Sequence, residues 1–331
     1  MVSNKILNIA IIGAGLIGKK RAQAFKEIRG VRFSGAYDID KTRMKALVLE
    51  FGGKAYKSWG KTVSDKQVDA VVVATSHGWL SPIALEAVKN KKHVLIEKPG
   101  AIRAKELKVV LAVARKNHVA ARVGYNHRFH PAVTKAHSLL KQGAVGTLLY
   151  ARGVYGHGGR KGYDKEWRAD PKRSGGGELM DQGSHLIDLF QYFFSEPQLK
   201  FARLKTYFWK MPVEDNAFMV LENNVGQLGF LHASWTQWKN IFSFEIFGTR
   251  GAVVIRGLGG SYGPESLTLY VRPSEGGVPR EKFWSWEGTD ESFLLETREF
   301  LRTVRNTADR YRGIKDAIRN LEIIGSAYRM K

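Results

Sequence analysis

The chain has 331 residues and no cysteine, and 44% of its residues are hydrophobic. This length and apolar content suffice for two domains with substantial cores. The lack of cysteine excludes disulfides and thiolate metal sites. No apolar run is long enough for a transmembrane helix, and residues 1–5 lead into an expected strand without the pattern of a signal peptide. We therefore expect a cytoplasmic protein with no membrane partner.

The chain is strongly basic, with 53 lysines and arginines, 31 aspartates and glutamates, and a formal net charge of +22. Most of the excess lies in residues 1–125. It favours an anionic partner, which could be a dinucleotide, a phosphorylated or nucleotide-linked substrate, or nucleic acid. Only residues 19–21 and 89–92 are clustered, and no zinc-finger spacing or RNA-binding signature accompanies them. We therefore expect no nucleic-acid partner.

A glycine-rich turn follows the first expected strand, residues 6–12, and precedes a helical pattern over residues 19–28. The first glycine of a G-x-G-x-x-G motif allows a tight turn, the second lets a pyrophosphate approach, and the third lets the helix pack closely. In this strand–turn–helix context the motif predicts a dinucleotide site. The residues assigned to cofactor contact are Gly13, Gly15, Leu16, Ile17 and Gly18.

The second expected strand, residues 31–37, ends in Asp38, twenty residues after Gly18. A carboxylate there can accept hydrogen bonds from a ribose diol and repels a 2′-phosphate, so NAD is expected over NADP. Lys41 and Arg43 follow closely and could instead reach a phosphate. An ordinary turn or N-cap role is the alternative for Asp38.

Polar residues end two further strands of the same half. Thr75, Ser76 and His77 follow the buried run 68–74, and Lys98 ends the strand 94–99. Ligands bind at the carboxyl ends of strands in open α/β sheets. The remaining expected elements are helices over 82–89 and 104–117 and a strand over 119–123. This alternation predicts a doubly wound α/β domain over residues 1–125.

The pattern changes after Asn126-His127-Arg128. A helix is expected over 131–142, and helices over 291–305 and 314–330 close the chain. The expected strands between them are 148–154, 201–209, 217–222, 227–235, 242–247, 252–255, 267–271 and 283–286. Two of them, 228–235 and 242–247, are apolar at both parities, so both of their faces should be covered. We expect helices on one face and a second copy of the chain on the other, giving a homodimer or homotetramer.

Residues 174–194 combine three glycines with a helical pattern. Asp181 and His185 are four residues apart and share one helical face, and Asp188 lies about one turn further along. By themselves these residues also fit a core histidine held by a carboxylate, or a metal pair with i,i+4 spacing.

The glycine fingerprint with Asp38, Glu97-Lys98-Pro99, Asn126-His127-Arg128 and the stretch containing Asp181, His185 and Asp188 occur in one order along nearly the whole chain. In this order they resemble the glucose–fructose oxidoreductase and inositol dehydrogenase (Gfo/Idh/MocA) family. The resemblance implies an N-terminal NAD-binding Rossmann domain over 1–125. It also implies a C-terminal α+β domain over 126–331, with an open, mostly antiparallel sheet that serves substrate binding and oligomerisation.

The resemblance also implies site residues. Lys98, Asp181 and His185 would form the catalytic group, and no metal is expected. The further cofactor contacts would be Thr75, Ser76, His77, Glu97, Lys98, Asn126, Trp167 and Arg168. The chain departs from the family at Leu80, where a histidine would be expected.

Oxidation of a secondary alcohol needs a base, a hydride acceptor and positive charge near the oxygen. A histidine, with an ordinary pKa of about 6.5, suits the base, NAD the acceptor and lysine the charge. Further substrate contacts are expected from Arg128, His157, Arg160, Tyr163 and Lys165, whose cations favour an anionic or nucleotide-linked sugar. The alternatives are a glycosidase that oxidises its substrate transiently with NAD, and a non-catalytic dinucleotide-binding regulator.

Overall fold

The computed structural model describes residues 6–307 and 309–330, which form two compact units. The first unit joins the chain up to Tyr125 with Phe293–Leu321, and the second comprises Asn126–Ser292 and the residues from Glu322 onward. The sequence analysis places the closing helices with the second domain. The difference arises because Phe300 and Leu301 are buried in the apolar core of the first unit.

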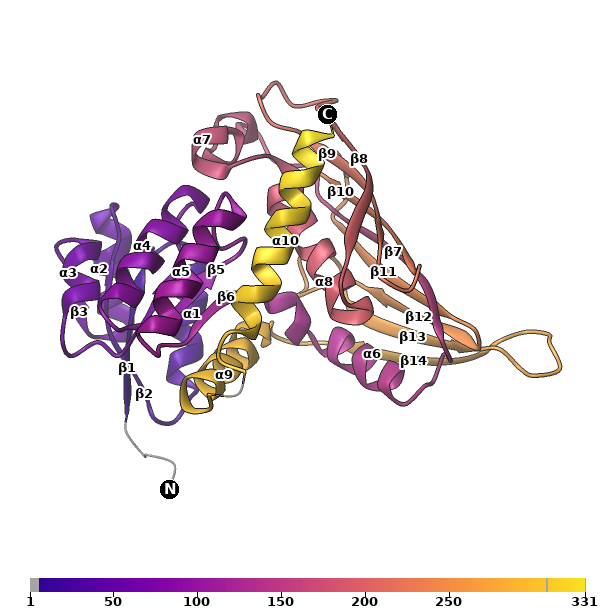
Figure 1. The fold of residues 1–331 in the computed structure, drawn as a ribbon, viewed down its shortest axis with the longest axis horizontal. Helices are drawn as coiled ribbons and strands as arrows, with labels where there is room; N and C mark the ends of the chain where they lie inside the picture. The colour runs from indigo at the N-terminus through magenta and orange to yellow at the C-terminus, as the bar shows by residue number, and fades with distance from the viewer. Residues whose placement is uncertain (1–5, 308, 331) are drawn as a thin grey trace. The chain divides into compact units, whose positions relative to one another are not determined.

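The first unit contains a six-stranded sheet in which every adjacent pair is parallel (Figure 1). The strand order is β3-β2-β1-β4-β5-β6. This is the order of a dinucleotide-binding doubly wound fold and confirms the expected fold class. The strands are β1 (Leu7–Ile12), β2 (Val31–Tyr37), β3 (Lys54–Ala55), β4 (Ala70–Val73), β5 (His93–Glu97) and β6 (Ala121–Gly124).

Two helices of this unit begin earlier than the sequence predicts. Helix α1 begins at Leu16 because Gly15 of the glycine turn is its N-cap, and α4 begins at His77 with Pro82 inside it. Both shifts bring the start of a helix close to the carboxyl end of a strand, where a ligand would lie. The helices that lie wholly or partly in this unit are α1 (Leu16–Lys26), α2 (Lys41–Phe51), α3 (Trp59–Ser64), α4 (His77–Lys89), α5 (Ala104–Lys116), α9 (Ser292–Arg305) and α10 (Arg312–Arg329), whose residues from Glu322 onward belong to the second unit.

A buried arginine connects three elements of the first unit. Arg21 on α1 is fully buried, and its guanidinium donates to Glu97 at the end of β5 (2.7 Å) and to Glu296 on α9 (2.6 Å). A buried charge is tolerated only when it is paired and hydrogen-bonded. Arg21 therefore ties the helix after the glycine turn to the strand end that precedes Lys98.

The second unit is built on an eight-stranded sheet with the order β14-β13-β12-β11-β7-β10-β9-β8. All neighbours are antiparallel except β7 and β10. This confirms the expected open, mostly antiparallel sheet. Its strands are β7 (Leu148–Gly156), β8 (Gln198–Lys205), β9 (Asn216–Glu222), β10 (Leu228–Ser234), β11 (Ile241–Gly248), β12 (Gly251–Arg256), β13 (Glu265–Val271) and β14 (Arg280–Trp286).

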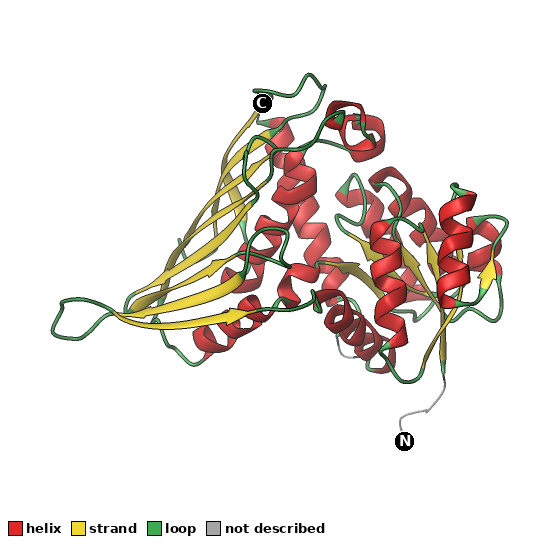
Figure 2. Ribbon diagram, turned by 180° about the vertical axis from the view of Figure 1, so that it is seen from behind, coloured by secondary structure: helices red, strands yellow, loops and turns green. Residues whose placement is uncertain are grey.

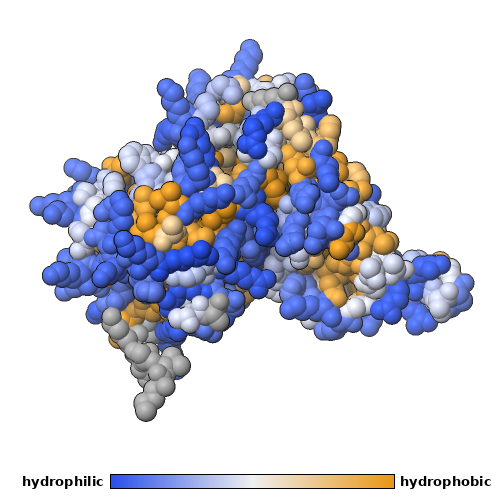
Figure 3. All heavy atoms as spheres, viewed as in Figure 1, coloured by the Kyte–Doolittle hydropathy of each residue, from blue (hydrophilic) through white to orange (hydrophobic). Residues whose placement is uncertain are grey.

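Helices α6 (Pro131–Lys141) and α8 (Ser184–Phe194) cover one face of this sheet (Figure 2). Burial alternates along the strands, so that Leu231 and Phe244 face the helices while Phe230 on β10 is 48% exposed. Apolar side chains are also exposed on other strands of the sheet, Phe201 and Phe283 among them, and Figure 3 shows apolar surface over these strands. Among the described residues, helices cover only one face of the sheet.

One expected strand is misplaced. The strand predicted over 201–209 is β8, which ends at Lys205. The backbone N–H groups of Tyr207, Phe208 and Trp209 all donate to the carboxylate of Asp215 at 2.8–3.0 Å. This carboxylate turns the chain out of the sheet, and aromatic content alone does not reveal that contact.

Among the described residues no helix is both long and apolar enough to cross a bilayer.

We expect Arg21→Met to destabilise the protein strongly, because it leaves the partly buried Glu97 and the fully buried Glu296 without their cation. Removing one partner of a buried ion pair typically costs about 3–5 kcal/mol. The measurement is the free energy of unfolding by urea titration. Arg302→Met is the matched control, since Arg302 is 47% exposed and its pair with Glu299 should contribute less than about 1 kcal/mol. Equal effects of the two substitutions would contradict the assignment.

Candidate functional site

The three glycines of the first turn differ in their surroundings. A Cβ at Gly13 would overlap the carbonyl oxygen of Ala74, and a Cβ at Gly18 would overlap that of Gly13. Gly13 also has a φ of +104°, which favours glycine. At Gly15, by contrast, an added Cβ would meet no atom within 4 Å. Open space over the helix N-terminus at Gly15 fits a pyrophosphate, while Gly13 and Gly18 shape the turn.

Asp38 lies beside this turn. One carboxylate oxygen accepts from the N–H of Ala14 at 2.5 Å and the other from the N–H of Asp40 at 2.8 Å. The carboxylate therefore organises the glycine turn, and its second lone pairs are left for a diol. Arg43 forms an ion pair with Asp40 at 3.2 Å, so the cation near this strand end already has an acidic partner.

The other residues predicted at this edge occupy the ends of β4 and β5. Thr75 and Ser76 connect β4 to α4, and His77 is buried in the first turn of that helix. Leu80, which replaces the expected histidine, is fully buried and belongs to the core. Exposed Leu16 and half-buried Ile17 open α1.

Glu97 and half-buried Lys98 end β5, and Glu97 holds Arg21. Because carboxyl ends of parallel strands share one edge of a sheet, these residues and the glycine turn form the first part of the candidate site.

In the second unit, a single turn of π-helix, η4 (Leu179–Gly183), leads into α8. Asp181 lies in that turn, His185 and Asp188 lie on α8, and all three are buried. The single α-helix expected here is therefore interrupted by a wider turn. Such π-turns are rare and frequent at functional sites.

Asp181 belongs to a row of ion pairs. It accepts from Nε of Arg168 at 2.8 Å, and Glu166 pairs with both Arg168 (3.9 Å) and Arg160 (2.7 Å). The guanidinium of Arg168 also lies 4.6 Å from the centre of the Trp167 ring. The row brings Asp181 and Arg168 together, and it pairs Arg160, a predicted substrate cation, and Arg168, a predicted cofactor contact, with carboxylates of the chain.

Arg128 is held in the same manner. Its guanidinium donates to both oxygens of Asp188, at 2.7 and 2.6 Å. Asn126, another predicted contact, donates to the hydroxyl of Ser292 at 2.8 Å. Arg128 therefore neutralises the buried Asp188, a role that residue type alone does not reveal.

The remaining loop residues divide into buried and exposed ones. Tyr163 is 2% exposed and packs edge-on against Trp235, so it belongs to a small aromatic core. His157 accepts from the N–H of Gly159, and burial lowers its pKa. Lys165 is exposed. Among the predicted substrate cations of this loop, Lys165 and Arg160 are exposed, and Arg160 is paired with Glu166.

Sequence reasoning missed a buried polar chain beside His185. Tyr155 on β7 hydrogen-bonds to Tyr262, Tyr262 donates to the amide oxygen of Gln182 at 2.7 Å, and the amide nitrogen donates to buried Glu178. Burial and nearby carboxylates raise the pKa of Tyr155 well above its ordinary value and that of Tyr262 to about 12. Both phenols are therefore neutral donors. Tyr155 lies just beyond the strand predicted over 148–154, which hid it.

The sequence analysis assigns no role to His127. Its ring stacks on that of His185 with centroids 3.7 Å apart and an interplanar angle of 23°. The only sequence signal is its place in Asn126-His127-Arg128.

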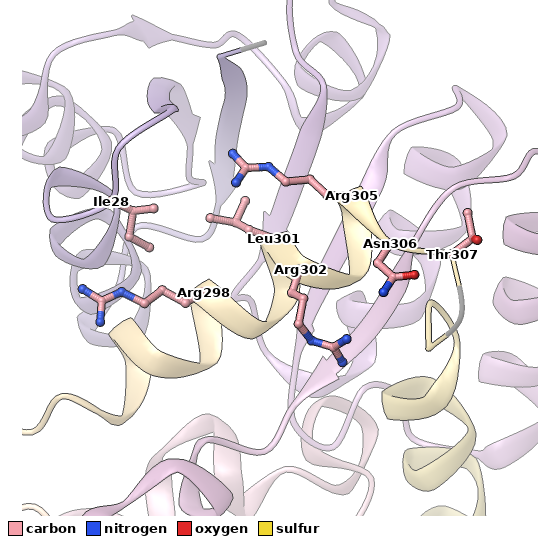
Figure 4. A pocket seen from close by; sticks show the side chains of 7 residues that line it. All are labelled: Ile28, Arg298, Leu301, Arg302, Arg305, Asn306 and Thr307. Atoms are coloured by element: carbon pink, nitrogen blue, oxygen red, sulfur yellow. The ribbon is translucent and has the colours of Figure 1, made fainter. Parts of the chain in front are cut away.

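A cavity of about 600 Å³ lies elsewhere in the first unit, between Ile28 and α9 (Figure 4). Arg298 and Arg305 extend towards the side of Ile28, whereas Arg302 extends away from it. Gly30 follows Ile28 and pairs with Leu7 at the start of β1. The cavity thus adjoins the amino ends of the strands and is no part of the candidate site.

Across the described chain no group of three or more histidines and acidic residues is placed to hold a metal ion.

Two family models match the chain. Residues 7–125 match the oxidoreductase family with an NAD-binding Rossmann fold, and residues 133–254 match the GFO/IDH/MocA C-terminal domain. The chain is 32% identical to glucose-6-phosphate 3-dehydrogenase of Bacillus subtilis over 191 residues, which cover 56% of this chain and 53% of that protein. It is 26% identical to levoglucosan dehydrogenase of Pseudarthrobacter phenanthrenivorans, over 75% and 73% of the two chains.

Myo-inositol 2-dehydrogenase of Thermotoga maritima is 24% identical, over 91% of this chain and 89% of that protein. Among solved structures, levoglucosan dehydrogenase in complex with NADH superposes with a TM-score of 0.85 at 22% identity, covering 98% of both chains. Together with the fold and the glycine turn, the two family models show that this chain belongs to the Gfo/Idh/MocA oxidoreductases, with an NAD-binding Rossmann domain at its N-terminus.

Proposed function

We propose that the protein is an NAD-dependent dehydrogenase that oxidises a secondary hydroxyl of a sugar or polyol. The observation that carries the proposal is the buried Asp181 and His185 on successive turns of the second unit. It is supported by the open glycine turn and by Lys98 at a strand end of the first unit. When bound, NAD would accept a hydride.

The chain's own residues have separate roles in this proposal. The neutral imidazole of His185 takes the hydroxyl proton. The ammonium of Lys98 stabilises the negative charge that develops on the oxygen. Asp181, fixed by Arg168 at 2.8 Å, accepts a hydrogen bond from a substrate hydroxyl and so orients the sugar.

Within this class, ion pairing favours a neutral substrate. Arg128, Arg160 and Arg168 all form ion pairs with carboxylates of the chain. An anionic substrate would have to compete with these carboxylates, so the three arginines lend less support to a nucleotide-linked sugar than residue type suggested. The names of the relatives include both kinds, since levoglucosan and myo-inositol are neutral and glucose 6-phosphate is not.

The substrate is tested by following NADH formation with neutral and phosphorylated sugars and polyols at two salt concentrations. We expect net oxidation of a neutral compound whose kcat/KM changes little with salt, because exposed charge steering is screened within about 8 Å at physiological salt. Turnover confined to phosphorylated or nucleotide-linked sugars, and weakened by salt, would contradict the neutral preference. A product released without net oxidation would instead indicate the glycosidase.

We expect His185→Ala and Lys98→Ala to lower kcat by about 10²–10⁴-fold, the usual contribution of acid–base groups. Circular dichroism and the melting temperature establish that the variants fold. The matched control is His118→Ala, at a surface turn of the first unit with a positive φ. A His185→Ala enzyme with a nearly normal kcat would show that the histidine is structural.

Gly15→Val separates cofactor binding from folding. Because the space over Gly15 is open, the variant should keep its melting temperature while its Kd for NAD rises at least about tenfold, a change of about 1.4 kcal/mol. Gly18→Ala should instead lower the melting temperature. Gly60→Ala, whose Cβ would meet only Ser58 Oγ at 3.8 Å, should change neither. Unaltered NAD affinity in Gly15→Val, measured by calorimetry, would exclude a pyrophosphate at the turn.

We also propose that the uncovered face of the second sheet binds a second copy of the chain. Phe230, Phe201 and Phe283, on three strands of this sheet, are 48%, 45% and 65% exposed. Exposed apolar surface of this extent marks association sites. The proposal predicts a dimer or tetramer at micromolar concentration.

Phe230→Glu should shift the mass towards the monomer, because it buries a charge at the interface. Light scattering measures the change, and Val278→Glu, at an 87% exposed position, is the control. A wild-type mass of about 37 kDa would refute the proposal.

A further inference from the structure

Two histidines of the second unit are stacked, and the proposed function gives a role to only one of them, His185. His127 and His185 are 7% and 4% exposed, and their ring centroids are 3.7 Å apart. The rings meet face to face, at an interplanar angle of 23°. Imidazole nitrogens donate and accept in the plane of the ring, so faces stacked in this way do not pass a proton between them. Any coupling between the two rings is therefore electrostatic.

His127 is fixed on all sides. Its Nδ1 lies 3.3 Å from Oδ1 of Asn126. The centre of its ring lies 5.2 Å from that of Tyr155 and 6.0 Å from that of Phe242. Tyr155 is a neutral phenol because burial raises its pKa. The ring is thus held against His185 by η1 (Asn126–Phe129) on one side and by strands β7 and β11 on the other.

The charged groups around the pair are mostly engaged with one another. His130, whose ring lies 5.5 Å from that of His127, bonds Glu265 at 2.9 Å and lies 3.9 Å from Asp290. On the same element as His127, the cation Arg128 is bound by Asp188 on α8.

The remaining carboxylates are those of the π-turn. Asp181 is bound to Arg168, and Glu178 accepts from Gln182. With these carboxylates paired, the two imidazoles are left close to each other, at a centroid distance of 3.7 Å.

We propose that His127 is a positioning residue that holds the His185 ring in place and keeps it neutral, because a proton bound by His127 disfavours a second proton on His185. Two unit charges 3.7 Å apart in a buried site repel strongly, so the pair holds one proton readily and a second only at much lower pH. A singly protonated pair can carry its proton on His127 and leave His185 able to act as a base. The inference rests on the proposed role of His185 as the base.

A titration that needs no activity tests the coupling directly. In the wild-type protein, the imidazole signals of His127 and His185, followed by NMR against pH, should each titrate in two steps. In His127→Phe, which keeps a stacked ring but removes the second site, His185 should titrate in a single step. His127→Gln provides a second neutral variant if the phenylalanine does not fit. An unchanged, single-step His185 curve in wild type and variants would overturn the inference.

Kinetics then show whether the coupling serves catalysis. We expect the acid limb of the wild-type kcat profile to fall in two steps, and that of His127→Phe to fall in one step at higher pH. At alkaline pH the kcat of His127→Phe should stay within about threefold of wild type, whereas His127→Ala, which frees the ring of His185, should fall further. A purely structural His127 would lower kcat equally at every pH.

His232 provides the control. It stacks on Phe218 at 4.2 Å, a ring without charge, so His232→Phe should leave the titration and the acid limb unchanged. If the wild-type protein shows no NAD-linked turnover but its histidines titrate in two steps, the proposed function fails while the coupled pair stands. If turnover is normal and the two-step titration is absent, only the pair is refuted.

Discussion

The first unit depends on one buried cation. Arg21 lies on the helix that begins at the glycine turn, and its two carboxylate partners lie on β5 and on α9. Burial raises the pKa of Glu296, while the guanidinium opposes that rise, so the ion pair and the packing stabilise each other. Because Glu296 and Phe300 come from the end of the chain, the first 125 residues do not complete this core alone. The position of Glu97, next to Lys98, is set by the same contact.

The second unit faces a different electrostatic problem, since it buries several carboxylates near His185, the proposed base. Each of Asp181 and Asp188 has an arginine partner, and Glu178 bonds a neutral amide. Unpaired, these carboxylates would hold His185 in its charged form. The pairing of these carboxylates is compatible with the proposed role of His185 as a general base, which requires a neutral imidazole.

The sequence predicted the two sheets and the glycine turn because these depend on local signals. Continuous apolar runs gave the strands of the parallel sheet, and spacing gave Gly13, Gly15 and Gly18. It could not predict which arginines would be neutralised, since Arg128 meets a partner 60 residues away and Arg21 one 275 residues away. The turn at Asp215 and the π-turn at Asp181 escaped for the same reason, because each depends on contacts or backbone geometry that residue type does not encode. The assignments of Lys98, Asp181 and His185 came from the family resemblance, and their chemistry remains a proposal.

The strong basic excess illustrates how residue type and function can diverge. Counted along the sequence, Arg128, Arg160 and Arg168 suggest an anion-binding pocket, yet each lies against a carboxylate that folding also buries or half-buries. Arg128 and Arg168 offset the charge of the buried Asp188 and Asp181, whereas Arg160 pairs with Glu166 at the surface. What distinguishes a structural cation from a binding cation is therefore the charge of its surroundings. Surroundings also separate Gly15 from Gly13 and Gly18, because only at Gly15 of the three does the structure leave space for the proposed pyrophosphate.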